Sequence, residues 1–413
     1  MSPTTCLFIT HSFPSIGSAN SLCDERLICF RSKSEKVVVL CYRFPGQEKH
    51  ETQGNIEIVR VWKDEFWGIE RLARSSSKNR FYQKATKLIY RLRQLLYLPF
   101  FPNYERIAVH VLFKNAVKIV RENNIGNLFA DFNGTDTLLG GYKAAKKTRI
   151  NFYPIFWDGL SVGMRSRYVS ASFNDRRKKA LEKKIIDSSR LSFFLNQAKD
   201  KLLFDYSDRP DLIKKMRFFG LPLFNPMAGN SRERSAREES QIVFICGGSL
   251  LGRDFIPFFS EIGGLFENNL KILLYPTTYS PEEIKKIRQF SFVEICGVLS
   301  AAEFTKQCLK SDILIAGGVK SPYLPTGKLY EFFATGKPVI YLCRNEADPA
   351  LSDIKKYPLS YVFYDNSSLN SAEALKAFIQ KNRQARLSKN EMDNLFPENR
   401  PETFWKLIND LQK

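Results

Sequence analysis

Residues 321–343, SPYLPTGKLYEFFATGKPVIYLC, constrain the possible fold more than any other part of the chain. They follow an apolar run at 313–316 that is typical of a buried parallel strand. A helix is predicted to begin with Thr326 as its N-cap and to end at Gly336, because glycine favours a left-handed cap and a proline follows two residues later. Another buried strand is predicted at 339–342. This succession predicts a strand–helix–strand unit whose helix start lies at the ligand-binding edge of an α/β sheet.

Residues 325–340, PTGKLYEFFATGKPVI, resemble the donor-binding signature of GT-B glycosyltransferases, and of retaining glycosyltransferase family 4 in particular. The resemblance implies that Glu331 binds the ribose hydroxyls of a nucleotide-diphosphate sugar. It also implies that three residues face the diphosphate and the sugar: Thr326, Gly327 and Lys328. Many family members carry another Glu eight residues before the ribose Glu, where this chain has Tyr323. The spacing alone equally fits an ordinary α/β crossover with a capping Thr and a solvated Glu.

A glycine-bearing loop, GGSLLGRD at 247–254, follows a predicted strand at 242–246 and precedes a helix. Glycines let backbone amides approach a phosphate, and an arginine in the loop can pair with it. By the resemblance, this loop binds the donor through Gly247, Gly248, Ser249 and Arg253. A later loop would seat the nucleobase on the backbone around Val298. The family pattern has two cations in the first loop, and Gly248 stands where one of them is expected.

The N-terminal part opens with a predicted strand at 5–10, a glycine-bearing loop at 11–20, a helix and a strand at 36–42. This loop resembles the loop that lines the acceptor cleft in family 4, which makes Gly17, Ser18 and Asn20 acceptor-binding candidates. A plain tight turn fits it equally well. Asp158 follows a predicted strand at 150–157 and is a catalytic candidate at the carboxyl edge of the sheet. An Asp-Gly pair is also a common turn former.

The length of 413 residues exceeds one typical hydrophobic core and predicts two domains. The predicted fold class is α/β, a GT-B arrangement of two Rossmann-like parallel-sheet domains facing a cleft. We expect an acceptor-binding domain at 1–222 and a nucleotide-sugar domain at 223–399, with a C-terminal helix at 400–413 crossing back to the first domain. The polar stretch 225–240 is the predicted linker.

The chain has 63 Lys and Arg against 43 Asp and Glu, a formal net charge of +20, which predicts attraction to phosphates, anionic lipid or nucleic acid. Residues 60–101 interleave basic and aromatic side chains. This mixture favours peripheral contact with an anionic membrane surface. A solvated helix and a nucleic-acid site remain alternatives, and no nucleic-acid partner is expected. A second basic cluster at 165–184 is expected to be a solvated face.

The eight Cys show no CxxC pair, and the three His form no cluster with metal-ligand spacing. We therefore expect reduced thiols, a cytoplasmic protein, no metal and no cofactor besides the nucleotide sugar. No secretory signal is evident, and no apolar run has the length of a transmembrane helix.

The sequence thus predicts a hexosyltransferase that transfers a sugar from a nucleotide-diphosphate sugar to a glycan or lipid-linked acceptor, in bacterial surface polysaccharide synthesis. Arg253 and Lys328 are assigned to stabilise the leaving nucleotide without a metal, with Asp158 as the third catalytic candidate. Retention of configuration is implied by the resemblance. A non-catalytic anion- or nucleic-acid-binding α/β protein and a GT-B nucleotide-sugar epimerase are the alternatives.

Overall fold

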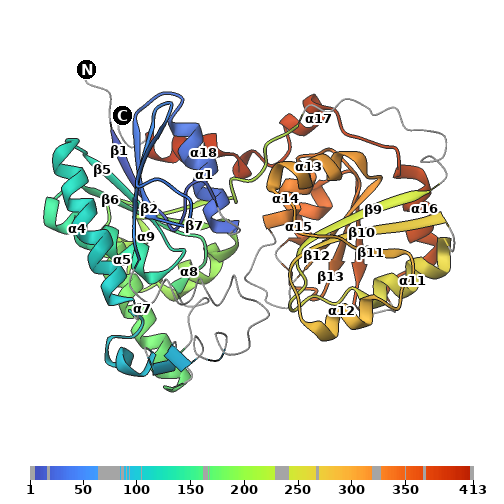
Figure 1. Cartoon of the computed structure of the whole chain (residues 1–413), viewed down its shortest axis with the longest axis horizontal. Coiled ribbons are helices and arrows are strands. Elements are labelled where there is room, and N and C mark those ends of the chain that lie inside the picture. The colour runs from blue at the N-terminus through green and yellow to red at the C-terminus, as the bar shows by residue number, and fades with distance from the viewer. Residues whose placement is uncertain are drawn as a thin grey trace. The chain divides into compact units, whose positions relative to one another are not determined.

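The computed structural model describes residues 5–15, 19–63, 84, 88–89, 91–92, 94–103, 105–160, 166, 168–227, 241–266, 269–318, 327–348, 350–365 and 369–409 (Figure 1). The chain divides into two compact units. The N-terminal unit comprises Met1–Pro222 and Pro401–Lys413, and the C-terminal unit comprises Leu223–Arg400.

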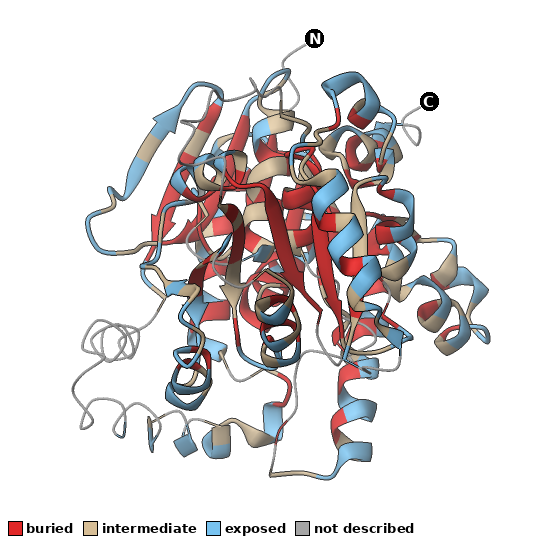
Figure 2. Ribbon diagram, turned by 90° about the vertical axis from the view of Figure 1, so that its right-hand side faces the viewer, coloured by how far each residue is buried: buried red, intermediate tan, exposed pale blue. Residues whose placement is uncertain are grey.

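The N-terminal unit is built on an eight-stranded sheet of order β3-β4-β2-β1-β5-β6-β7-β8. Its strands are β1 (Cys6–Ile9), β2 (Val37–Tyr42), β3 (His50–Gln53), β4 (Ile56–Val61), β5 (Asn127–Asp131), β6 (Asn151–Phe156), β7 (Ser192–Leu195) and β8 (Met216–Phe219). Neighbouring strands are parallel except for the β3–β4 hairpin. The central strands are continuous apolar runs because helices cover both of their faces, and Figure 2 shows them as buried.

The helices of this unit are α1 (Ala19–Arg31), α4 (Arg106–Glu122), α5 (Thr135–Thr148), α7 (Ala171–Ser188), α8 (Lys199–Asp205), α9 (Pro210–Ile213) and α18 (Pro401–Asn409), with short 3-10 turns η1 (Leu98–Phe100) and η2 (Asn196–Ala198). The C-terminal helix α18 packs in this unit. The Trp405 Nε1 donates to the Leu27 carbonyl at 3.0 Å, and the ring of Phe404 lies 4.6 Å from that of Phe193. The end of the chain therefore helps to close the core that its beginning starts.

The C-terminal unit contains a six-stranded parallel sheet of order β11-β10-β9-β12-β13-β14. Its strands are β9 (Ile242–Ser249), β10 (Leu270–Thr278), β11 (Val293–Ile295), β12 (Ile313–Gly317), β13 (Val339–Cys343) and β14 (Ser360–Tyr364). Its helices are α11 (Ile256–Phe266), α12 (Pro281–Ile287), α13 (Ala301–Lys310), α14 (Gly327–Phe333), α15 (Leu351–Lys356), α16 (Ala372–Asn382) and α17 (Lys389–Asp393), followed by the 3-10 turn η5 (Pro397–Asn399).

The strand–helix–strand unit predicted at 313–342 is confirmed as β12, α14 and β13. The apolar face of α14 is buried, with Phe333 stacked between Tyr357 (4.2 Å between centroids) and Phe396 (5.0 Å). Gly336 has a φ of +72°, and a Cβ there would lie 2.7 Å from the Leu387 carbonyl oxygen, so the predicted glycine cap is required twice over. The predicted N-cap Thr326 lies outside the described residues, as does most of the predicted linker.

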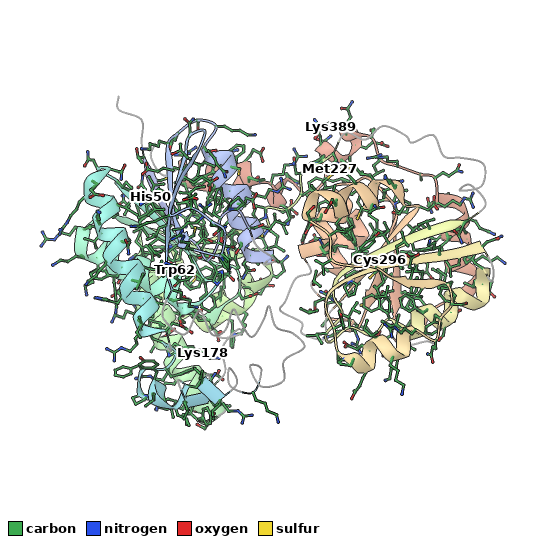
Figure 3. The ribbon with its side chains drawn as sticks, viewed as in Figure 1. His50, Trp62, Lys178, Met227, Cys296 and Lys389 are labelled. Atoms are coloured by element: carbon green, nitrogen blue, oxygen red, sulfur yellow. The ribbon has the colours of Figure 1, made fainter. Side chains whose placement is uncertain are left out.

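Two basic residues that the sequence places on solvated surfaces are buried instead. Arg60, expected on the membrane-facing stretch, is 1% exposed on β4, where its Nη2 lies 2.7 Å from Glu51 Oε2 and donates to the Phe13 carbonyl. Lys178, labelled in Figure 3, is 0% exposed on α7, with its Nζ 3.1 Å from Asp175 Oδ1. Both predictions are wrong because a partner compensates the buried charge. Glu51 and the Phe13 carbonyl do so for Arg60, and Asp175, three residues away on the same helix, does so for Lys178.

Candidate functional site

The first turn of α14 carries an ion pair between two predicted donor residues. The Nζ of Lys328 lies 2.9 Å from Glu331 Oε2, and both side chains are about a quarter exposed. The same Nζ lies 4.7 Å from the ring centroid of Phe304, on α13. The Phe304 ring and the half-buried surroundings hold the Lys328 ammonium group in place beside Glu331.

Phe304 also connects this pair to Gly247, near the end of β9. The glycine loop predicted to begin at Gly247 begins later, because pairing with β10 extends β9 to Ser249. A Cβ on Gly247 would lie 2.4 Å from the Phe304 Cζ, so only a glycine lets this ring lie against the strand end. Gly247, Lys328 and Glu331 are thus brought together around one aromatic ring. The sequence analysis did not identify Phe304, because its place on the apolar side of a short helix indicates burial and nothing more.

Arg253 lies at the other side of the same loop. Its Nη1 donates to the Ser249 carbonyl, and its Nε is buried without a hydrogen-bond partner among the described residues. A Cβ on Gly317, at the end of β12, would lie 2.9 Å from the Arg253 Cδ. Burial lowers the pKa of Arg253 from its very high ordinary value. The Arg253 side chain therefore passes over the end of β12 at Gly317, where a larger residue would displace it. Its guanidinium lies near Gly248, which has a φ of +110°.

A pocket of about 240 Å³ opens beside Arg253. Its lining comes from the glycine loop, the start of α11, α12 and the end of β13, and consists of Leu250, Gly252, Arg253, Asp254, Phe255, Ile256, Glu283, Lys286, Ile287 and Arg344. Arg344 connects three elements, since its Nε donates to Asp365 Oδ2 and its Nη1 donates to the Gly252 carbonyl, both at 2.7 Å. Arg344 therefore braces the loop that carries Arg253, a role that no local pattern indicated.

The other predicted donor-binding residues, Ser249, Val298 and Gly327, lie on three different parts of the C-terminal unit. Ser249 accepts a hydrogen bond from Thr278 Oγ1 at 2.5 Å, which ties the loop to the end of β10. Val298 lies in the loop between β11 and α13 and is 70% exposed. Gly327 is the first residue of α14. Glu303 and Ser300 form a capping box at the start of α13, which fixes where the Val298 loop ends.

In the N-terminal unit the structure brings Asp158 and Asn20 together. Asp158 follows β6, and its half-buried carboxyl accepts a hydrogen bond from the Asn20 side chain, on the first turn of α1. Burial raises the pKa of Asp158, and the Asn20 hydrogen bond opposes that rise. Gly17 and Ser18 lie outside the described residues.

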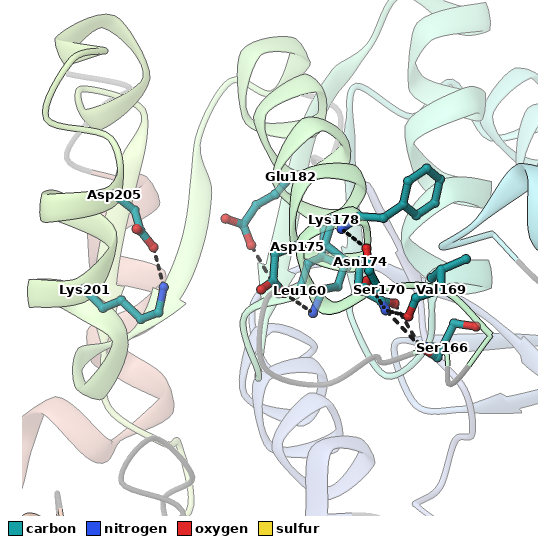
Figure 4. Close-up of polar contacts among 11 residues, drawn as sticks. Leu160, Ser166, Val169, Ser170, Asn174, Asp175, Lys178, Glu182, Lys201 and Asp205 are labelled. Carbon is teal, nitrogen blue, oxygen red and sulfur yellow. Dashed lines mark hydrogen bonds and ion pairs between the residues drawn. The ribbon is translucent and has the colours of Figure 1, made fainter.

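Buried polar side chains of α7 hold the chain that follows Asp158 (Figure 4). The Leu160 amide donates to Glu182 Oε2 at 3.1 Å, and the Ser166 amide donates to Asn174 Oδ1 at 2.9 Å. The Asn174 Nδ2 returns a hydrogen bond to the Ser166 carbonyl at 3.0 Å. Because these backbone groups have buried partners on α7, that helix positions Leu160 and Ser166.

A carboxyl pair, Asp24 and Asp131, lies buried at the carboxyl ends of β1, β5 and β6 and was not identified from the sequence. Asp24 accepts from Thr10 Oγ1 at 2.7 Å and from Trp157 Nε1 at 3.0 Å. Asp131 lies close enough to interact with it, and both carboxyl oxygens of Asp131 are buried without a hydrogen-bond partner among the described residues. Burial raises the pKa of Asp24 to about 6. Burial and the Asp24 charge raise the pKa of Asp131 well above its ordinary value. Burial and the neighbouring charge therefore favour the protonated form of Asp131.

This pair should make stability depend on pH. Both carboxyls have folded pKa values above the unfolded ones, so their contribution is complete below about pH 4 and is lost as the pH rises through the folded values. Asp131→Asn supplies a permanent donor to Asp24, and we expect it to raise the melting temperature at pH 8 by about 3 °C or more and to flatten its pH dependence. Thermal melts between pH 4 and 8 measure both.

Asp24→Asn is the matched control, because its amide cannot accept both the Thr10 and the Trp157 hydrogen bonds. It should lower the melting temperature at every pH. Equal effects of the two variants would contradict the assignment of the proton to Asp131.

Across the described ranges, no group of three or more His, Cys, Asp or Glu side chains is arranged to hold a metal ion. In the same part of the chain, no helix is both long enough and apolar enough to span a bilayer.

The whole chain is similar to several solved structures. HepE from Anabaena in complex with UDP and glucose is 13% identical, with 99% of each chain covered and a TM-score of 0.62. WaaG, a glycosyltransferase involved in lipopolysaccharide biosynthesis, is 11% identical, with 98% of this chain and 99% of that chain covered and a TM-score of 0.59. A UDP-N-acetylglucosamine 2-epimerase is 12% identical, with 99% and 95% covered and a TM-score of 0.54.

No family model and no curated protein sequence matches the chain. The likenesses to solved structures extend over both units and establish the fold. The predicted α/β class, a GT-B fold with two Rossmann-like units, is confirmed.

Proposed function

We propose that the chain is a glycosyltransferase that transfers a hexosyl group from a nucleotide-diphosphate sugar to a glycan or lipid-linked acceptor, as in bacterial surface polysaccharide synthesis. The observation that carries the proposal is the Lys328–Glu331 pair beside the Gly247 loop. A cation and a carboxylate 2.9 Å apart, at the carboxyl end of a parallel sheet, match the diphosphate and the ribose of such a donor. The likeness to a fold that holds UDP and glucose in HepE supports it.

In this proposal the chemistry depends on charge at the leaving group. Negative charge develops on the nucleoside diphosphate as the bond to the sugar breaks, and Arg253 with Lys328 stabilises it. Glu331 exchanges part of its contact with Lys328 for the ribose hydroxyls. Asp158, with Asn20 beside it, belongs to the acceptor side. Retention of configuration follows the resemblance to family 4.

The test is incubation of the full chain with pooled nucleotide sugars and candidate acceptors, followed by mass spectrometry. The expected result is a sugar-extended acceptor together with free nucleoside diphosphate. The likeness to a UDP-N-acetylglucosamine 2-epimerase favours an epimerase as the second candidate. An epimerase would change UDP-N-acetylglucosamine without any acceptor. A chain whose melting temperature responds to polyanions but to no nucleotide would contradict both.

Removal of divalent metal should leave this activity intact. Two cationic side chains neutralise the leaving group in the proposed mechanism, so we expect turnover in excess EDTA to stay within about twofold of the untreated rate. Initial rates with and without chelator measure this. Full inhibition that Mg²⁺ or Mn²⁺ reverses would show that a metal, and not Arg253 and Lys328, neutralises the diphosphate.

A further inference from the structure

The N-terminal unit exposes a row of leucine side chains ahead of α4. Those of Leu88, Leu92, Leu95 and Leu96 are 57%, 51%, 47% and 74% exposed. The described residues between 88 and 96 are helical, and positions i, i+4, i+7 and i+8 share one face of a helix. These four residues, the leucine face, therefore form an apolar stripe on the outside of the unit. Exposed apolar stripes of this kind mark interaction surfaces.

The chain after the leucine face is firmly anchored. Phe101 is 1% exposed, and Arg177 of α7 donates from Nε to the Phe101 carbonyl at 3.1 Å and from Nη2 to the Pro99 carbonyl at 2.9 Å. Phe100 and Ile107, on either side of this anchor, are each 45% exposed. Figure 1 shows this part beside α7, at the end of the N-terminal unit where the segment is coloured cyan. The hydrogen bonds from Arg177 therefore fix the backbone next to the exposed Phe100 side chain.

Basic side chains outnumber acidic ones in this region. Between positions 71 and 104 the sequence contains no Asp or Glu, and its basic residues are Arg71, Arg74, Lys78, Arg80, Lys84, Lys87, Arg91 and Arg93. Among the described residues, Lys84, Arg91 and Arg106 are exposed, as is Arg176 on α7. The Arg106 guanidinium lies 3.9 Å from the Phe100 ring centroid, so a cation and an exposed aromatic side chain are presented together.

We propose that the leucine face, with Phe100 and Ile107, inserts into the interface of an anionic lipid bilayer while Arg91, Arg106 and Arg176 contact the headgroups. Apolar insertion beside basic side chains is how a helix binds a membrane surface without spanning it. A second copy of the chain would bring like charges together, and nucleic acid would leave the leucines exposed. Arg60, Lys63 and Phe101 take no part, because each is buried or paired within the unit.

The test is co-sedimentation of the full chain with vesicles of phosphatidylcholine alone or mixed with phosphatidylglycerol. We expect binding to the mixed vesicles only, weakening as salt rises. Leu92→Ser with Leu96→Ser should lower the partition coefficient about tenfold or more. Phe204→Ser is the matched control, because Phe204 is 81% exposed on α8 and should not affect binding. Arg91→Gln with Arg106→Gln should weaken binding, whereas Lys118→Gln on α4 should not.

Three outcomes would overturn the proposal. The leucine variant could sediment like the wild type, the wild type could bind neutral vesicles equally well, or the wild type could be a dimer in solution that the leucine substitutions dissociate. The measurement needs neither donor nor turnover, so its result is independent of the proposed function.

Discussion

Arg253→Ala should lower turnover by about a hundredfold or more while the protein stays folded. One preorganised group that stabilises developing charge is commonly worth about 2.7 to 4 kcal/mol. In the proposed mechanism Arg253 stabilises the leaving group from a loop that Arg344 braces, so its charge would be held in place before the donor binds. Lys328→Ala should have a similar effect from the other side of the loop. Initial rates at saturating donor, with a thermal melt of each variant, measure both.

Gly317→Ala tests the position of the Arg253 guanidinium without removing its charge. Its Cβ would lie 2.9 Å from the Arg253 Cδ and 3.0 Å from the Phe255 Cζ, so the guanidinium must shift although its charge remains. We expect a turnover loss that approaches that of Arg253→Ala. Arg288→Ala is the control for loss of an arginine, because this side chain is exposed at the end of α12 and does not line the pocket beside Arg253. Normal turnover in Arg253→Ala would refute its assignment to the leaving group.

The elements around α14 were predictable because their signals are local. Buried parallel strands are continuous apolar runs, and the glycine at 336 followed by a proline ends a helix in any context. The structure has β12, α14 and β13 in the predicted places. The glycine loop was only partly predictable, because it was expected to begin at Gly247 but pairing with β10 extends β9 to Ser249.

The buried Arg60 and the buried Asp24 and Asp131 could not be predicted, because the groups they contact are distant in the sequence or lie on another element. Arg60 is compensated by Glu51 on the neighbouring strand and by the Phe13 carbonyl from the loop after β1. Asp24 and Asp131 are more than one hundred positions apart and meet only where β1, β5 and β6 end side by side. A sequence pattern records that a residue is charged, but the sheet order decides whether that charge is compensated.

The site shows the same division. The resemblance assigned Lys328 and Glu331, and the structure pairs them, but the ring that supports them and the arginine that braces the opposite loop come from elsewhere. Phe304 is held against Gly247, and Arg344 is held by Asp365. Neither residue type at its position carries a chemical signal, since each acts through the residues it contacts.

Glu331→Ala should abolish tight donor binding with little loss of stability. A buried or half-buried carboxylate that accepts hydrogen bonds from two hydroxyls contributes about 1.5 to 3 kcal/mol, which corresponds to a dissociation constant raised about 10- to 150-fold. The stability cost is small, because a partly exposed pair at this helical spacing is worth only about 0.2 to 0.5 kcal/mol. Titration calorimetry with UDP and a thermal melt measure the two effects.

The controls distinguish the ribose contact from the ion pair. Lys328→Ala also breaks the pair but leaves the Glu331 carboxylate free, so UDP binding should weaken through the lost diphosphate contact alone. The loss of UDP binding free energy in the double variant should differ from the sum of the two single losses, because the two side chains are in contact and each single variant also breaks their ion pair. Glu122→Ala, which breaks the exposed Lys118–Glu122 pair on α4, should leave UDP binding unchanged. If Glu331→Ala binds UDP as tightly as the wild type, Glu331 is only a partner of Lys328 and the ribose is held by another group.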